Sequence, residues 1–554
     1  MKSKNGHTGN FVPRNRTDVT QNWGIFGRLD SVVFIVSAII CFGFILWGAV
    51  DHEALAVVLG QLLSATVSNW GWMYQAGVLF FVVFCFAVAL SKYGKIKFGK
   101  DDDVPEYSNF SWFAMLFGAG MGVGLIYWSV AETVSHFFTG PVYAGASGSP
   151  QAAEWAMAIS FLHWGISPWA IYVVVGIPMG LAIFRKGLPA LVSSCFYPIL
   201  GDRIYGPLGK FIDIVALCIT FFGVSTTIGL GTMQLGAGLS FNYGIPLNNN
   251  VYIIILIVVA IAYLASAVLP IDRGIKVGSD VSMIACLGLL LFLFILGPTK
   301  YIMDNFVNAT GLYVQNFITM STWTDPVGQT GWLNSWTIFY WAWWISWAPF
   351  VGMFIAKISK GRTIKQFVIA AIIAPSIFDM VFFDIFGSTA LHFEFAEATK
   401  GLIQKAIESD VANGIYILFD QFPFSDVITI VILFVVFTFF VVSADSATIV
   451  LGMLSSGGND SPGTSLKILW GVAMAFSAGI LIIMGGLTAV QTVPIVAVFP
   501  FMFILFALCY STVKMLQEDH LFKEIAEIGS GKNEDELEKI ELNNVTQQME
   551  MDKD

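Results

Sequence analysis

Apolar runs long enough to cross a bilayer recur along the whole chain and constrain its fold more than any other feature. A membrane-spanning helix needs about 20 predominantly apolar residues, and backbone inside a bilayer must satisfy its hydrogen bonds within helices or a closed barrel. Only 12% of the 554 residues are charged and 56% are hydrophobic, a composition unlike that of a soluble domain. We therefore predict an all-α membrane protein with twelve transmembrane helices, at about residues 31–50, 72–91, 111–131, 155–184, 211–239, 250–270, 279–298, 332–356, 366–391, 426–455, 466–487 and 490–513.

The basic residues predict how these spans are oriented. Even-numbered loops carry Lys and Arg, for example Lys95 and Lys97 after the second span and Arg362 after the eighth, whereas the first, third and fifth loops carry none. Cytoplasmic loops are the ones enriched in Lys and Arg, so we expect both termini in the cytoplasm of a multi-pass cell-membrane protein. The predicted parts are a cytoplasmic arm over 1–30, a transmembrane domain over 31–516 and a cytoplasmic tail over 517–554. The tail has twelve acidic residues against four lysines.

Several function classes are not expected. No Gly-x-x-x-x-Gly-Lys-Ser/Thr loop is present, so ATP-driven pumping by this chain is not predicted. There is no His-Glu-x-x-His or Cys-x-x-Cys pair either, and all six cysteines fall in apolar runs. We therefore predict no enzyme activity, no transition-metal site, no cofactor and no nucleic-acid partner.

A cluster of tryptophans in the eighth span gives the best indication of function. Lipid-facing helices normally keep Trp at the membrane interfaces, but here Trp341, Trp343, Trp344 and Trp347 lie within seven residues. With about 100° between successive residues, Tyr340 and the last three of these Trp residues share one helix face. A wall of electron-rich rings binds cations without N–H donors, above all quaternary ammonium groups.

Two other spans contain features that favour a binding site. In the third, Gly118, Gly120, Gly122 and Gly124 alternate with larger residues and would weaken a helix, which is tolerated where unwound backbone lines a cavity. The alternative is close helix packing through small residues. Because the glycine-rich third span and the Trp-rich eighth span are five spans apart, spans 3–7 and 8–12 are expected to form two inverted five-helix repeats.

The fourth span carries a second aromatic group, beside Pro168, which is expected to kink the helix. Trp164, Trp169 and Tyr172 are candidates to complete an aromatic cage with the eighth span; the alternative is that they fill the core or anchor an interface. His163 is either a proton shuttle or a hydrogen-bonded structural residue. Asp379 and Asp384 lie in the ninth span without an evident basic partner.

Oxygen-bearing residues suggest a site for Na⁺. Ser443 in the tenth span, with carbonyls freed at Gly118 and Met121, offers the oxygen ligands that hard cations prefer. Thr226 and Thr227 in the fifth span form a second oxygen cluster, although such hydroxyls commonly bond back to their own helix. The remaining candidate sodium residues are Phe350 and Phe439.

Taken together, these motifs resemble the betaine–carnitine–choline transporter family, and glycine betaine transporters most closely, over about residues 30–515. The motifs are Gly120-Met121-Gly122-Val123-Gly124, His163-Trp164-Gly165, Asp272-Arg273-Gly274-Ile275-Lys276, Ser443-Ala444-Asp445-Ser446, and Tyr340 to Trp347 continuing to Gly361-Arg362-Thr363. The resemblance implies a leucine-transporter-like fold and a homotrimer. It also implies a quaternary ammonium held by Trp164, Trp169, Tyr172, Trp343, Trp344 and Trp347, with Trp341 on the cytoplasmic route.

Two positions refine what the resemblance implies. Choline-type members tend to carry Asp where this chain has Gly124, so a zwitterion such as glycine betaine is expected, with its carboxylate on backbone N–H groups of the stretch Gly120, Met121, Gly122 and Gly124. Sodium-coupled members generally carry Thr where this chain has Val442. The expected function is import by Na⁺ symport with alternating access. The alternatives are a sodium-independent carnitine/betaine-type exchanger, choline uptake, and a channel or sensor.

Overall fold

The computed structural model describes residues 19–120, 122–268 and 271–529, and most of them are helical. A short antiparallel hairpin, β1 (Gln21–Asn22) and β2 (Arg28–Leu29), pairs Gln21 with Leu29 and precedes the first long helix. The first part of the bundle contains α2 (Ser31–Val50), α3 (His52–Leu90), α4 (Asn109–Gly120), α5 (Val123–Thr139), α6 (Pro150–Trp164), α7 (Ile166–Phe184), α8 (Tyr197–Leu200), α9 (Pro207–Tyr243), α10 (Asn249–Val268), α11 (Ile271–Leu296) and α12 (Thr299–Thr322). The second part contains α13 (Phe339–Lys357), α14 (Ile364–Phe395), α15 (Leu402–Ser409), α16 (Gly414–Phe419), α17 (Ser425–Ser455), α18 (Thr464–Gly485) and α19 (Leu487–Gly529).

The structure confirms an all-α protein of membrane-spanning type. Within the described residues, ten helices are long and apolar enough to cross a bilayer, or eleven if the pair α11 and α12, which bends by 106°, forms one span. The predicted third run is not among them, because it is divided between α4 and α5, each shorter than 18 residues. The count of twelve spans and the repeat layout therefore remain predictions.

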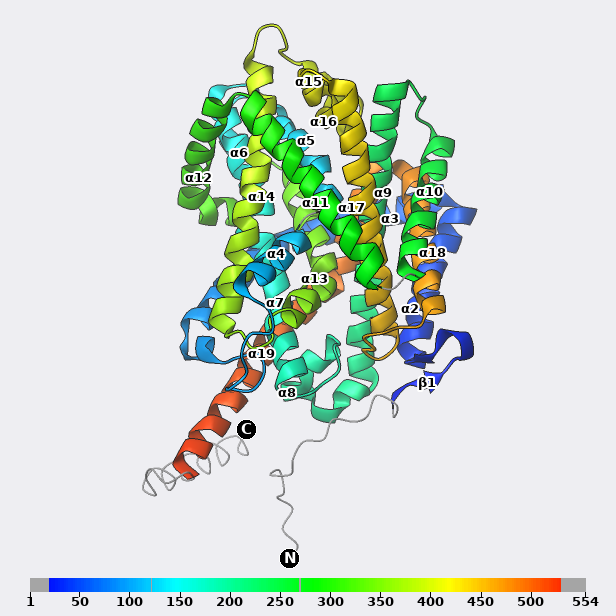
Figure 1. Ribbon diagram of the computed structural model, residues 1–554, viewed down its shortest axis with the longest axis vertical. Coiled ribbons are helices and arrows are strands. Elements are labelled where there is room, and N and C mark those ends of the chain that lie inside the picture. The colour runs from blue at the N-terminus through cyan, green and yellow to red at the C-terminus, as the bar shows by residue number, and fades with distance from the viewer. Residues whose placement is uncertain (1–18, 121, 269–270, 530–554) are drawn as a thin grey trace, which may run out of the picture.

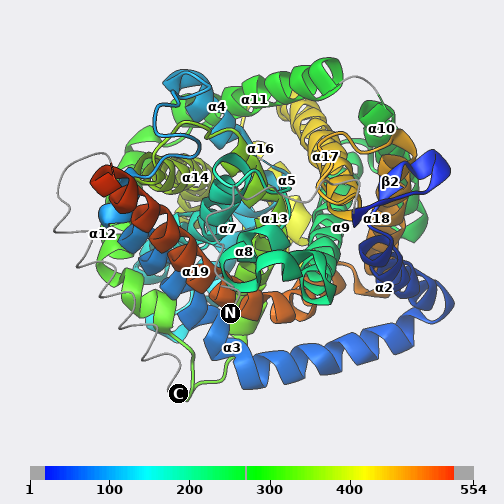
Figure 2. The same cartoon turned by 90° about the horizontal axis from the view of Figure 1, so that it is seen from below.

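Two helices differ from the sequence-based expectation. The second span was predicted at 72–91, but α3 begins at His52, where Asp51 ends α2 and accepts a hydrogen bond from the Ala54 N–H at 2.9 Å. No span was predicted over 299–322, yet α12 occupies these residues. Polar residues in α12 interrupt its apolar run, so hydropathy alone did not reveal this helix. Figure 2 shows α12 and α3 at the outside of the bundle, with α7 and α13 at its centre.

Interruptions in the third and fourth spans lie where glycine and proline occur. The third is interrupted between α4 and α5, where Gly122 is extended with φ −160° and ψ 178°. The fourth is interrupted at Gly165, three residues before Pro168, which takes its place in the first turn of α7. A proline there loses no helical hydrogen bond, since first-turn N–H groups have no intrahelical partner. The N–H of Ile166 instead donates to the Tyr313 hydroxyl of α12 at 3.3 Å.

The basic loops lie at one end of the molecule. Figure 1 shows β1, α8 and the end of α19 at this end and α15 and α16 at the opposite end. Helix α19 continues across the predicted boundary at 516/517. Arg185 in the basic loop after α7 pairs with Asp519 at 2.6 Å, and Lys186 pairs with Glu518 at 2.7 Å. The described start of the acidic tail is thus helical and attached to a basic loop, while 530–554 fall outside the described residues.

A backbone ladder joins the loops that precede α4 and α14. The Phe98 N–H donates to the Arg362 carbonyl at 2.9 Å, and the Gly361 N–H donates to the Phe98 carbonyl at 2.7 Å. The Arg362 guanidinium lies 4.4 Å from the ring centroid of Trp112 in α4, a cation–π contact. These bonds hold the start of α4 close to the end of α13, and both helices contribute to the cavity described next.

Candidate functional site

A cavity of about 630 Å³ lies at the centre of the bundle, within the range typical of small-molecule sites. It is enclosed by α4, α5, α6, α7, α9, α11, α13, α14 and α17, which come from both halves of the chain. All six aromatic residues that the resemblance assigns to a cage line this cavity: Trp164, Trp169, Tyr172, Trp343, Trp344 and Trp347. The structure thus brings three residues of the fourth span against three of the eighth.

The cage rings pack against one another at defined angles. Trp343 and Trp344 stack with their centroids 4.8 Å apart and 15° between their planes, and Trp164 meets Trp344 edge-on at 4.8 Å and 77°. Trp169 and Tyr172 form a separate edge-on pair, at 5.5 Å and 86°. Such edge-on and stacked geometries are favourable for aromatic pairs, so the rings are held as a rigid lining.

The indole N–H groups of four cage rings are fixed by acceptors on other helices. These acceptors are a carboxylate for Trp164 and Trp169, a hydroxyl for Trp343 and a backbone carbonyl for Trp344. The bonds are Trp164 to Glu132 Oε2 at 2.7 Å, Trp169 to Asp379 Oδ2 at 3.0 Å, Trp343 to Thr227 Oγ1 at 3.2 Å and Trp344 to the His163 carbonyl at 3.0 Å. Trp347 differs, because its buried Nε1 has no hydrogen-bond partner among the described residues.

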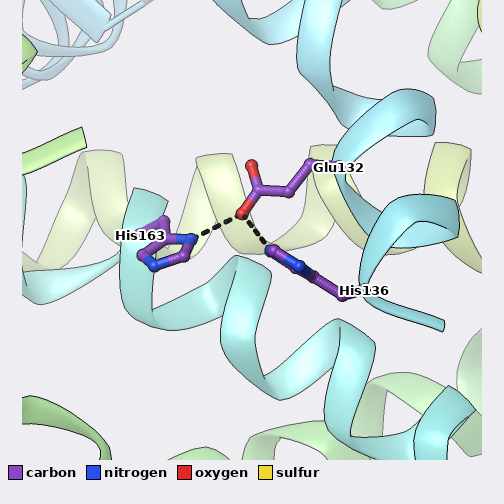
Figure 3. Close-up of side chains that lie close together, drawn as sticks. All are labelled: Glu132, His136 and His163. Carbon is purple, nitrogen blue, oxygen red and sulfur yellow. Dashed lines mark hydrogen bonds and ion pairs between the residues drawn. The ribbon is translucent and has the colours of Figure 1, made fainter. Parts of the chain in front are cut away.

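Glu132 is the centre of a buried network behind the cage (Figure 3). It is 0% exposed, and its Oε1 lies 2.7 Å from His163 Nδ1 and 3.3 Å from His136 Nε2. Its Oε2 accepts the Trp164 N–H and, at 2.5 Å, the Tyr340 hydroxyl. With Nδ1 donating to Glu132, His163 Nε2 accepts from the Thr337 hydroxyl at 2.9 Å. Both ring nitrogens of His163 are hydrogen-bonded, which agrees with the structural role that was one of the two expected for it.

The sequence did not reveal this function of Glu132. The only signal was a carboxylate in an apolar run four residues before a histidine. The ligand atoms of Glu132, His136 and His163 lie within 4.8 Å of one another, a donor set that suits a transition metal. The two Glu132 oxygens already have four donor partners, so we interpret the cluster as the support that orients Trp164 and Tyr340. That no transition metal binds remains a prediction.

Gly124 is required by the packing of two cage rings. A Cβ added there would lie 2.7 Å from Trp343 Cη2 and 3.1 Å from Trp164 Cη2, closer than ordinary contact permits. The sequence argument about residue 124 was electrostatic: glycine there leaves the site without the negative charge of the aspartate that choline-type relatives tend to carry. The structure adds a steric reason, since no larger side chain fits while both rings keep their positions.

The candidate sodium residues do not form one group. Thr227, Phe350 and Ser443 line the cavity, as does Val442, at the position where sodium-coupled relatives generally have Thr. Thr226 instead donates to the Val490 carbonyl at 3.1 Å, joining α9 to α19, and Phe439 is a buried core residue of α17. Gly118 and Gly120 belong to the backbone of α4, with Gly120 as its last residue, and Met121 lies outside the described residues.

Trp341 lies apart from the cage rings. It is fully buried, its indole N–H donates to Gln75 Oε1 of α3 at 2.8 Å, and it is not among the residues that line the cavity. It lies on the face of α13 that turns toward α3, because two positions along a helix rotate a side chain by about 200° from Trp343. The structure therefore gives no support to a position for Trp341 on the cytoplasmic route.

The lining of the cavity includes exposed residues of α13 and α11. It extends along α13 to Lys357, whose side chain is 32% exposed and which pairs with Asp460, and to exposed Asp280 of α11. Loop 357–363 lies at the end of the molecule where Figure 1 shows β1 and α8. Toward the other end the buried Glu132 network and the packed rings of Trp128 and Trp336 cover the cage. The described conformation is thus open toward the basic loops.

The sequence is similar to that of known transporters. The family model described as "BCCT, betaine/carnitine/choline family transporter" matches residues 32–521. A probable glycine betaine transporter of Desulfitobacterium hafniense (strain Y51) is 40% identical over 90% of this chain and all of that protein. The glycine betaine transporter OpuD of Bacillus subtilis (strain 168) is 40% identical over 89% of this chain and 95% of its own. An ectoine/hydroxyectoine transporter of Virgibacillus pantothenticus is 37% identical over 88% and 97%.

Proposed function

Because the chain belongs to the betaine/carnitine/choline family of transporters, we propose that it imports glycine betaine or a similar trimethylammonium zwitterion across the plasma membrane. The observation that carries the proposal is a central cavity lined by six aromatic side chains from both halves of the chain. A trimethylammonium group has no N–H bonds to water to lose, and each ring face contributes up to about 2 kcal/mol once water is excluded. The names of the two 40%-identical relatives point to the same substrate.

The other end of a zwitterion has a fitting environment at the start of α5. Gly122, Val123, Gly124 and Leu125 line the cavity where this helix begins. The Leu125 N–H donates to the Gly122 carbonyl at 3.2 Å, but the N–H groups of Val123 and Gly124 lie in the first turn, where the helix offers them no carbonyl, and the helix dipole places partial positive charge there. A substrate carboxylate is stabilised at such a helix start, which favours a zwitterion over an organic cation.

We further propose transport by alternating access, coupled to Na⁺. A cavity whose lining reaches Lys357 beside the basic loops, together with the buried Glu132 network behind the cage, is compatible with one state of such a cycle. Ser443 and Thr227 are the hydroxyl residues that we propose to take part in Na⁺ binding, since both line the cavity. We also propose that both termini are cytoplasmic, because the basic loops cluster at one end of the molecule. A trimeric assembly is proposed from the family resemblance.

Uptake into proteoliposomes tests the proposal. Radiolabelled glycine betaine is offered with and without an inward Na⁺ gradient, and choline, carnitine and proline betaine are added as competitors. We expect saturable accumulation against the substrate gradient that requires the Na⁺ gradient. Uptake that ignores Na⁺ but needs substrate inside the vesicle would instead establish an exchanger, stronger competition by choline would establish choline uptake, and passive flux without accumulation would establish a channel.

A further inference from the structure

Asp379 of α14 is a buried carboxylate on the wall of the substrate cavity. Its side chain is 3% exposed, and the residue lines the same cavity as the cage rings. A charged side chain at membrane depth is costly, and such residues face binding sites or pathways in membrane proteins. Its position is therefore a first indication that it contacts a transported group.

The two oxygens of Asp379 differ in their partners. Oδ2 accepts the Trp169 N–H at 3.0 Å, whereas Oδ1 has no hydrogen-bond partner among the described residues. No Lys, Arg or His of the described chain lies within ion-pair distance of Asp379. Buried polar atoms in native structures nearly always have a partner, so Oδ1 is an acceptor that lacks its donor.

The other charges around the cavity do not supply that donor. Lys357 stands at the mouth of the cavity and already pairs with Asp460, and the other charged residue of the lining is a second carboxylate, exposed Asp280. The lining thus has an excess of negative charge and favours a cationic group. Because Oδ2 bonds the edge of Trp169, the carboxylate lies beside a ring that we propose contacts the substrate's positive end.

Asp384, five residues further along α14, is a buried carboxylate of the same helix that lies away from the cavity. It is equally buried, but its Oδ1 accepts the Ser388 hydroxyl at 2.6 Å and it does not line the cavity. The two carboxylates therefore differ in whether they face the cavity, which makes Asp384 a control for the loss of a buried charge on the same helix.

We infer that Asp379 is a specificity-determining residue whose Oδ1 accepts a hydrogen bond from a cationic N–H group of the substrate. The aromatic rings favour a cation that loses no N–H bonds to water, whereas a buried acceptor compensates a substrate N–H group for the water that it gives up. The cavity then takes zwitterions with a tertiary ammonium or a cyclic amidinium group as well as those with a trimethylammonium group. This inference rests on the proposed function, since it concerns the same cavity and the same positive end of the substrate.

A matched pair of ligands isolates the N–H group. N,N-dimethylglycine and glycine betaine carry the same carboxylate and no net charge, and differ in one N–H in place of one methyl group. In Asp379→Asn the amide oxygen can still accept the Trp169 N–H, which leaves an NH₂ donor where Oδ1 stood. We expect the Kd of N,N-dimethylglycine, measured by titration calorimetry on the purified protein, to rise at least tenfold in this variant. The Kd of glycine betaine should rise by a clearly smaller factor, because this ligand loses the attraction of the Asp379 charge but no hydrogen bond.

Asp384→Asn is the matched control and should leave both dissociation constants unchanged. Equal effects of Asp379→Asn on the two ligands, no effect on either, or a wild-type protein that binds glycine betaine but not N,N-dimethylglycine would overturn the inference and leave the proposed function standing. A wild-type protein that binds neither ligand would refute the proposed function itself. The melting temperature of each variant shows whether lost binding reflects lost folding.

Discussion

Gly124 offers the sharpest test of how the cavity is built. A methyl group added there would lie 2.7 Å from Trp343 Cη2 and 3.1 Å from Trp164 Cη2, whereas ordinary van der Waals contact begins at 3.4 Å. The rings cannot move away freely, because Trp343 donates to Thr227 at 3.2 Å and Trp164 donates to Glu132 at 2.7 Å. Gly124→Ala must therefore displace the rings or strain these two hydrogen bonds.

The size of the effect follows from these contacts. Overpacking a well-packed site costs about 1–3 kcal/mol, which corresponds to roughly a 5- to 150-fold rise in Kd if the cost falls on the bound geometry. Titration calorimetry with glycine betaine measures it, and the melting temperature reports any loss of stability.

Gly311→Ala in α12 is the control outside the cavity. A Cβ at 311 would meet nothing within 4 Å, and Gly311 does not line the cavity. We expect its Kd to stay within threefold of the wild-type value. Unchanged binding in Gly124→Ala, or equal losses in the two variants, would refute the claim that ring packing requires glycine at 124.

Three further substitutions test other parts of the site. Trp347→Leu removes a half-buried cavity ring whose N–H donates to no other described residue. Because one ring contributes about 2 kcal/mol, we expect the Kd of glycine betaine to rise about thirtyfold. Trp341→Phe, outside the cavity, should leave this Kd unchanged, and the reverse pattern would refute the cage. Glu132→Gln places an amide NH₂ among four donors. It should lower both the melting temperature and the affinity for glycine betaine, because each charge-assisted hydrogen bond contributes about 1.5–3 kcal/mol. A melting curve like that of the wild type would contradict the supporting role of Glu132. Val442→Thr adds a hydroxyl beside Ser443 and should lower the Na⁺ concentration that gives half-maximal uptake, and an unchanged Na⁺ titration would argue that Na⁺ does not bind there.

Local patterns in the sequence were sufficient for much of the fold. Hydropathy identified apolar runs that the structure forms as helices, and the glycine-rich segment before 124 and Pro168 each predicted an interruption close to the one observed. The 100° period placed Trp343, Trp344 and Trp347 on one face, and all three line the cavity. These features depend only on neighbouring residues along one helix, so they can be read from the chain.

Tertiary structure decided the parts that join distant segments. Trp169 and Asp379 are 210 residues apart, and Tyr340 and Glu132 are 208 apart, so no local period relates them. The same holds for Trp341, which shares the cluster with the cage rings but turns to Gln75 of another helix. A sequence can show that Asp379 lacks a nearby basic residue, but only packing shows whether a cavity, a lipid face or another helix lies in front of it.

By itself, then, the sequence determined that this chain forms apolar helices with an electron-rich aromatic face and weak points in its third and fourth spans. The tertiary structure decided which rings meet, which carboxylates hold their indole N–H groups, and which carboxylate oxygen is left for a ligand. The physical reason is that helix formation and amphipathic periodicity are local, whereas a buried cavity exists only where several helices fail to fill the space between them.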